Sequence, residues 1–158
     1  MSGSRNGGFL IAKIHQAGGR IFNRLLKEYG LSDINSGQGR ILYVLWQKDG
    51  ISISELSAKT QLEKSTLTAM LDRLEKEKLV ERVPSPSDRR SIIIRATPKN
   101  RSLEKKYLAV SREMNDIFYG GMAEKDIDTF EKSLDHILAN LINEENISGG
   151  KDRNHGID

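Results

Sequence analysis

The chain of 158 residues contains no cysteine, and this absence excludes several kinds of site. Without thiols there is no disulfide framework, no thiolate-bound metal and no redox-sensing cysteine. The three histidines, His15, His136 and His155, fall on separate segments with no second ligand type at helical spacing. A zinc site is therefore not expected, and we predict no metal and no other cofactor.

Other signals are missing as well. No apolar run approaches membrane-spanning length and no signal peptide precedes the predicted domain, which favours a cytoplasmic protein without a membrane partner. The glycines never form a phosphate-cradling loop between a strand and a helix, and no nucleophile motif is present. The sequence therefore does not indicate an enzyme.

The net charge of +3 is small but unevenly placed. Residues 1–35 carry five basic and two acidic side chains, residues 36–97 carry eleven and eight, and residues 98–158 carry nine and twelve. The positive excess thus lies in the first 97 residues. This asymmetry fits a nucleic-acid partner, although a solvated surface can produce it too.

A helix with a single apolar stripe is predicted within residues 62–97. The stripe consists of residues spaced three and four apart: Leu67, Met70, Leu71 and Leu74. The opposite face is small or polar and carries Ser65, Ala69, Asp72 and Lys76, with Thr68 and Arg73 at its edges. Such a face suits a helix lying against base edges in a major groove. Taken alone, the pattern is equally typical of an ordinary amphipathic surface helix.

The flanking segments favour the first interpretation. Ser52 and Glu55 form a capping-box pattern that predicts a short helix through Lys59, and residues 60–62 form a tight turn. After the predicted recognition helix, residues 79–83 and 91–97 are rich in Val and Ile and predict two strands, and residues 51–53 could add a short third one. Two helices, a turn and a β-hairpin are the plan of a winged helix-turn-helix.

Several motifs in this region resemble the multiple-antibiotic-resistance regulator (MarR) family. Residues 88–94 (DRRSIII) contain the Asp-x-Arg-x-x-x-(Ile/Leu) wing signature, and residues 65–68 and 71–75 resemble the recognition helix. Residues 79–82 resemble the first wing strand, and Asn35, Gln38, Leu42 and Leu45 follow the pattern of an upstream helix. The resemblance covers about residues 35–103. Lys78, Asn100 and Gln61 depart from it, because the family usually has glycine at these positions.

The resemblance implies a homodimeric repressor that binds a pseudo-palindromic operator in double-stranded DNA. Two recognition helices would enter successive major grooves, one helical turn apart. The candidate groove residues are Lys64, Ser65, Thr66, Thr68, Ala69 and Arg73. The alternative is a winged helix that serves only as a protein-interaction module.

The wing candidates are Asp88, Arg89 and Arg90. We expect Arg90 to enter a minor groove and Arg89 to contact phosphate. Asp88 is expected to hold Arg90 in a bidentate ion pair, unless the two form only a turn-stabilising surface pair.

The resemblance also implies a small lipophilic or phenolic effector that enters a cleft between the dimerisation helices and the winged helix. His15, Arg20, Tyr43 and Trp46 are the candidate lining residues. Tyr43 and Trp46 are also compatible with ordinary core positions. The lack of cysteine removes the cysteine-based peroxide sensors of the family from consideration.

The predicted fold is mainly α with a small antiparallel β-wing: a winged helix-turn-helix flanked by N- and C-terminal dimerisation helices. Residues 1–7 form a disordered N-terminus, 8–34 a dimerisation helix, 35–97 the DNA-binding domain, 98–147 further dimerisation helices and 148–158 a disordered tail. The terminal helices carry long apolar stripes, which favour pairing with a second copy over an intrachain bundle.

Overall fold

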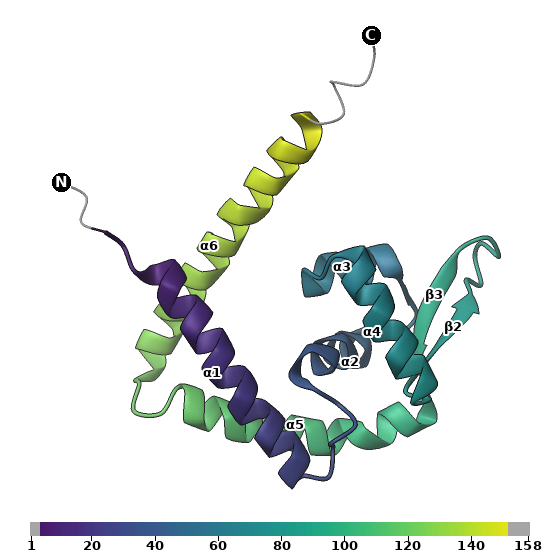
Figure 1. The fold of residues 1–158 in the computed structure, drawn as a ribbon, viewed down its shortest axis with the longest axis horizontal. Helices are drawn as coiled ribbons and strands as arrows, with labels where there is room; N and C mark the ends of the chain where they lie inside the picture. Colours follow the sequence, from purple (N-terminus) through teal and green to yellow (C-terminus); the bar gives the residue numbers. More distant parts are fainter. Residues whose placement is uncertain (1–3, 152–158) are drawn as a thin grey trace. The chain divides into compact units, whose positions relative to one another are not determined.

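The computed structural model describes residues 4–151, which form six helices and three strands. In chain order they are α1 (Gly7–Glu28), α2 (Ser36–Gln47), β1 (Ile51–Ser52), α3 (Ile53–Thr60), α4 (Lys64–Lys76), β2 (Val80–Pro84), β3 (Ile92–Ala96), α5 (Pro98–Phe118) and α6 (Glu124–Lys151) (Figure 1). The chain divides after Phe118 into two compact units, and the first contains everything from α1 to α5.

The predicted elements are present with small differences at their ends. α1 begins at Gly7, one residue earlier than expected, and residues 1–3 of the predicted disordered N-terminus lie outside the described residues. α6 continues to Lys151, so the first part of the tail predicted from Ser148 is helical. Extending a formed helix adds a hydrogen bond per residue without a new nucleation cost, so Gly149 does not end it. The rest of that tail, residues 152–158, is outside the described residues.

Side-chain caps explain where α2 and α3 begin. Asn35 Oδ1 accepts from the Gln38 backbone N–H at 2.9 Å, and Gln38 Oε1 accepts from the Asn35 N–H at 3.2 Å. This reciprocal capping box starts α2 as the sequence predicted. At α3, Ser52 Oγ accepts from the Glu55 N–H at 3.1 Å, which is one half of the predicted capping box; the Glu55 carboxylate instead accepts from Lys48 Nζ at 2.6 Å.

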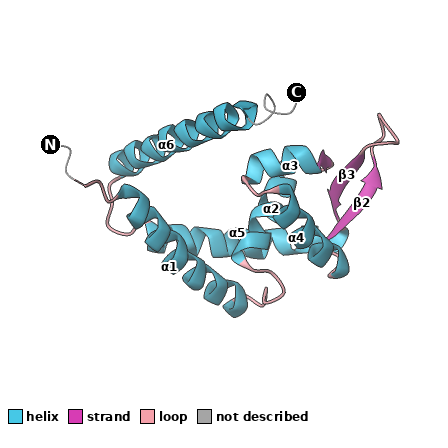
Figure 2. Cartoon of the chain, turned by 45° about the horizontal axis from the view of Figure 1, so that its top comes forward, coloured by secondary structure: helices cyan, strands magenta, loops and turns pink. Residues whose placement is uncertain are grey.

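The sheet has the order β1-β3-β2, with both pairs antiparallel. β2 and β3 form the wing hairpin, with Val80 opposite Ala96 and Pro84 opposite Ile92. Ile51 of β1 pairs with Ile94, so the short third strand suggested for residues 51–53 is present, over residues 51–52. Figure 2 shows the hairpin projecting from the helices as the outermost part of the winged helix.

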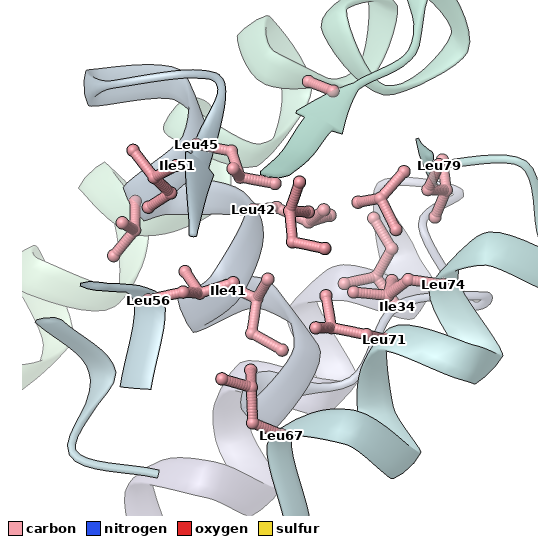
Figure 3. Close-up of a cluster of buried hydrophobic side chains, with 14 residues drawn as sticks. Ile34, Ile41, Leu42, Leu45, Ile51, Leu56, Leu67, Leu71, Leu74 and Leu79 are labelled. Carbon is pink, nitrogen blue, oxygen red and sulfur yellow. The ribbon is translucent and has the colours of Figure 1, made fainter. Parts of the chain in front are cut away.

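Two apolar clusters hold the first unit together. The larger lies inside the winged helix and joins α2, α3, α4 and the sheet around Leu42, Leu45 and Leu71, which are fully buried (Figure 3). The second joins α1 to α5 through Leu25, Leu26, Tyr107 and Val110. Trp46 packs against both clusters, so it links the winged helix to the α1–α5 pair.

The packing of α2 on α5 depends on a glycine. A Cβ built on Gly39 would lie 2.3 Å from the Tyr107 hydroxyl oxygen, much closer than any contact between non-bonded atoms. The missing side chain therefore makes room for the tyrosine ring between the helices. Within the part of the chain that the structure describes, no helix is long and apolar enough to cross a bilayer.

Candidate nucleic-acid interface

Helices α3 and α4 form the predicted helix-turn-helix. Between them Gln61 takes the left-handed conformation, with φ of 56°. The Ser57 hydroxyl donates to the Leu62 carbonyl at 2.6 Å and thereby ties the turn to α3. Gln61 occupies a position where the resemblance led us to expect glycine, and its backbone has the conformation that glycine adopts readily.

The apolar stripe of α4 decides which face of the helix is free. Leu67, Leu71 and Leu74 have no exposed surface, while Met70 at the edge of the stripe is half-buried. All six predicted groove residues lie on the exposed side of the helix: Lys64, Ser65, Thr66, Thr68, Ala69 and Arg73. Packing of the three leucines thus presents a continuous small and polar face to solvent.

Two details matter at the N-terminal end of this face. The N-cap residue, Glu63, makes no side-chain hydrogen bond to the helix. Thr68 Oγ1 donates to the Lys64 carbonyl at 2.7 Å, so its hydroxyl proton is used within the helix. What Thr68 presents outward is therefore its methyl group and the lone pairs of its oxygen, which suit a thymine methyl or a base donor.

The wing loop is closed by backbone hydrogen bonds and by Asp88. The Ser85 N–H donates to the Ser91 carbonyl at 2.8 Å, and the Ser91 N–H to the Asp88 carbonyl at 3.0 Å. Asp88 Oδ1 accepts from the Arg90 backbone N–H at 3.0 Å, and Oδ2 from the Ser91 hydroxyl at 3.1 Å.

The expected ion pair between Asp88 and Arg90 was wrong. Within residues 4–151 no salt bridge joins their side chains, because the carboxylate is already engaged by the backbone two residues on, as in an Asx turn. Asp88 shapes the loop, and the side chains of Arg89 and Arg90 are exposed at the wing tip. Two cations thus lie at the point of the hairpin that projects furthest.

Arg82 connects the wing to the recognition helix, and the sequence analysis did not single it out. Its Nη2 lies 2.7 Å from Asp72 Oδ1 and its Nη1 lies 3.1 Å from Glu75 Oε1. The two carboxylates are three residues apart on α4, and the arginine side chain is only 21% exposed. One guanidinium therefore pairs with two acids beside the exposed face, offsets part of their charge and ties β2 to α4. The spacing of Asp72 and Glu75 was the available signal.

The C-terminal end of α4 has a second set of contacts. The Leu79 N–H donates to the Leu74 carbonyl and the Lys78 N–H to the Glu75 carbonyl, both at 2.9 Å. This six-residue closure is a Schellman motif, and it places Lys78 at φ of 60°. Lys78, one of the departures from the family pattern, therefore adopts the left-handed conformation that is usual for glycine.

The predicted effector residues are dispersed. His15 and Arg20 are exposed on α1, and Tyr43 on α2 is 44% exposed. Trp46 is half-buried, and its indole N–H donates to Asn100 Oδ1 at 2.7 Å while its ring packs on Tyr107. Among the residues described, no hydrogen bond or ring contact joins these four side chains. Trp46 thus packs against the core without being fully buried, and a ligand cleft stays a prediction.

Neighbouring groups offer no sign of acid–base or metal chemistry. Burial raises the pKa of Tyr107 to about 12, so its phenol is neutral at physiological pH. Over residues 4–151 no cluster of histidines and carboxylates has the arrangement of a metal site. The arrangement that remains is an exposed helix face beside an arginine-tipped hairpin.

The sequence of this region is similar to that of known proteins. Residues 34–92 match the family profile described as MarR family. The chain is 34% identical over 90 residues to an uncharacterized HTH-type transcriptional regulator, YsmB of Bacillus subtilis; this match covers 57% of the chain and 62% of YsmB. It is 27% identical over 133 residues to the HTH-type transcriptional repressor IacR of Pseudomonas putida, covering 84% of the chain and 78% of IacR.

A solved structure agrees in fold. The crystal structure of a mutant MarR from E. coli complexed with operator DNA superposes with a TM-score of 0.74 at 26% identity, and covers 83% of this chain and 92% of that one. The matched share extends well beyond the 59 residues of the family profile, so the likeness includes helices outside the winged helix.

Proposed function

Because the chain belongs to the MarR family of transcriptional regulators, whose members are not enzymes, we propose that it is a regulator that binds double-stranded DNA as a homodimer. The observation that carries the proposal is the exposed face of α4 next to the arginines of the wing. A helix of this diameter fits a major groove, and a hairpin beside it can reach the adjacent minor groove.

The residues divide into two roles. Thr68 and Ala69 are short and exposed one turn into α4, where they meet base edges rather than phosphates. Lys64 and Arg89 supply charge for phosphates, and Arg90 enters the minor groove, where narrow A·T stretches attract a guanidinium. Two copies of α4 related by a two-fold axis then read a pseudo-palindrome with half-sites about one helical turn apart.

The regulatory part of the proposal is a repressor released by a small lipophilic or phenolic ligand. The relative IacR is named a repressor, which supports the sign of the regulation. Tyr43, His15 and Arg20 are exposed and remain the candidate ligand contacts, while Trp46 contributes from within the core. A ligand screen by thermal shift tests this: ligands that raise the melting temperature of the wild type should do so less for Tyr43→Ala.

Selection of bound duplexes from a random pool tests DNA binding itself. We expect a pseudo-palindromic sequence to be enriched. On that operator, Arg90→Ala should weaken binding by about 1–3 kcal/mol, the scale of one good specific contact, without changing the oligomeric state.

A pool that yields no palindrome would instead favour a winged helix used for protein interaction. Enrichment of an operator combined with full affinity of Arg90→Ala would retain the function and remove the wing arginine from it.

A further inference from the structure

The start of α5 contacts the segment that directly follows the recognition helix α4, which ends at Lys76. Three successive backbone carbonyls of that segment, those of residues 77–79, each accept a side-chain hydrogen bond, one from Thr97 just before α5 and two from the first turn of α5. Lys99 Nζ donates to the Glu77 carbonyl at 2.8 Å, and Thr97 Oγ1 donates to the Lys78 carbonyl at 2.6 Å. Asn100 Nδ2 donates to the Leu79 carbonyl at 2.9 Å. These contacts join α4, the start of β2 and the start of α5.

Asn100 is the buried member of this set. It has no exposed surface, whereas Lys99 is exposed and Thr97 is half-buried. Its amide group is used on both sides, because Nδ2 donates to Leu79 while Oδ1 accepts from the Trp46 indole N–H at 2.7 Å. Removing the amide would leave the Trp46 indole N–H without its partner and the Leu79 carbonyl with only the Thr97 N–H, at 3.3 Å, which is more costly than losing a surface hydrogen bond.

Trp46 extends the connection to the other half of the unit. Its ring lies 4.9 Å from that of Tyr107, centroid to centroid, and Tyr107 in turn meets Phe22 of α1 at 5.6 Å. A continuous series of contacts therefore leads from α1 through Tyr107, Trp46 and Asn100 to Leu79, whose own N–H closes the end of α4 by donating to the Leu74 carbonyl. α5 itself is one unbroken helix between these regions (Figure 1).

When contacts fix one end of a helix, the orientation of the helix there determines where its other end lies. From Lys76 back to Lys64, α4 is about 18 Å long, so a rotation of about 10° about its C-terminal end would displace the groove residues by about 3 Å. That exceeds the tolerance of a hydrogen bond to a base edge. The leucine stripe keeps α4 on the core, but apolar packing is less directional than a hydrogen bond.

We propose that Asn100 is a positioning residue for DNA recognition: bound to Leu79 and Trp46, it fixes the recognition helix in the orientation that reads bases. The inference rests on the proposed function. It adds a buried residue that does not contact DNA itself and acts only through the orientation of α4. It also connects Trp46, the single tryptophan of the chain, to the end of the recognition helix through Asn100.

The test compares three variants of the full chain on an enriched operator and on a scrambled duplex. Asn100→Ala removes both hydrogen bonds, and Trp46→Phe removes only the indole donor. Ser102→Ala is the matched control, because its hydroxyl donates within α5 to the Lys99 carbonyl and not to the end of α4. Circular dichroism at the assay temperature selects the conditions under which each variant is folded.

We expect Asn100→Ala to lose about five- to tenfold in operator affinity, within the usual range of coupling between sites. Affinity for the scrambled duplex and the salt slope should stay as in the wild type, because no phosphate contact is removed. Trp46→Phe should show a smaller loss of the same kind, and Ser102→Ala none. Backbone amides of residues 78 and 79 should exchange hydrogen faster in Asn100→Ala.

A merely structural role of Asn100 predicts other results. Equal losses on both duplexes, or unchanged operator affinity in folded Asn100→Ala, would overturn the inference. If Asn100→Ala failed to fold, Trp46→Phe decides, and full operator preference in that variant would overturn it. A wild-type protein without operator preference would overturn the proposed function together with the inference, whereas a preference retained in all variants overturns the inference alone.

Discussion

At the scale of single residues, two helices end in the same way with different residues. α1 closes with Gly30 at φ of 75° and α4 with Lys78 at φ of 60°. In both, the next residue is a buried leucine whose backbone N–H donates to the carbonyl of a leucine five residues earlier. A lysine pays about 1 kcal/mol or more for this conformation, whereas a glycine does not. Part of that difference is offset by the greater freedom of glycine in the unfolded chain.

We therefore expect Lys78→Gly to raise the free energy of unfolding by about 0.5–1 kcal/mol, and Gly30→Ala to lower it by about 1 kcal/mol. Urea unfolding followed by circular dichroism measures both. Glu77→Gly is the control, because Glu77 has φ of −76° and should lose stability with glycine. Destabilisation by Lys78→Gly would mean that the lysine side chain contributes more than its backbone strain costs.

A second comparison at this scale separates base reading from phosphate binding. Thr68→Val keeps the shape of the side chain and removes its oxygen, so it should change which bases are tolerated at one position in each half-site. Lys64→Ala should weaken operator and scrambled duplexes together and lower the salt slope by about one unit. Affinities across a salt series distinguish the two. Equal weakening of both duplexes by Thr68→Val would place a different face of α4 in the groove.

At the scale of elements, the recognition helix and the wing are joined by Arg82. Its guanidinium pairs with Asp72 and Glu75, so α4 and β2 are held in one relative orientation. Without the arginine, two carboxylates beside the proposed DNA-binding face of α4 would lose their paired cation and would repel phosphates more strongly. This predicts a larger effect on DNA affinity than on stability, because both carboxylates are exposed and an ion pair to an exposed group contributes only about 1 kcal/mol to folding.

Arg82→Ala should weaken operator binding about fivefold or more, on the scale of about 1 kcal/mol per charge pair lost beside phosphate. The loss should be smaller in a protein that already carries Asp72→Asn and Glu75→Gln. Arg95→Ala removes the same charge from the exposed side of β3 and serves as the control. If the loss were as large in the background without carboxylates, Arg82 would contact DNA directly.

Much of the secondary structure could be predicted from the sequence, because capping residues and the spacing of apolar residues are local patterns. The spacing of Leu67, Leu71 and Leu74 indicated the buried face of α4, and the Asn35–Gln38 pattern indicated the start of α2. The ion pair expected of Asp88 failed because a carboxylate two residues from a backbone N–H prefers that closer partner. The spacing of Asp72 and Glu75 indicated two acids on one side of α4, but it did not indicate which cation pairs with them. That partner, Arg82, and the contacts of Asn100 depend on the packing of α4, β2 and α5.

At the scale of the molecule, apolar side chains on both terminal helices remain exposed in the single chain. On α1 they are Phe9, Leu10, Ile11 and Ile14, and on α6 they are Ile137, Leu138, Leu141 and Ile147. Such surface is normally covered by another chain, which agrees with the proposed dimer. An aspartate within it would have to be desolvated on association.

Leu141→Asp should therefore shift the mass in sedimentation from twice 17.8 kDa toward 17.8 kDa at low micromolar concentration. Operator affinity should fall with it, because one chain reads one half-site. Asn143→Asp adds the same charge at an exposed polar position of α6 and should leave the dimer intact. A dimer unchanged by Leu141→Asp would locate the interface elsewhere.

The order of the sheet, β1-β3-β2, has a consequence for how the protein behaves in a crowded solution. Over residues 4–151 no strand pairs with the outer edge of β2, which is the kind of edge on which protein chains aggregate. This edge is protected by its own residues: Glu81 is charged and exposed, and Pro84 has no N–H to offer a further strand. β1, at the opposite edge, has only two residues. The wing can thus stand far out from the molecule to meet a nucleic acid without seeding β-fibrils.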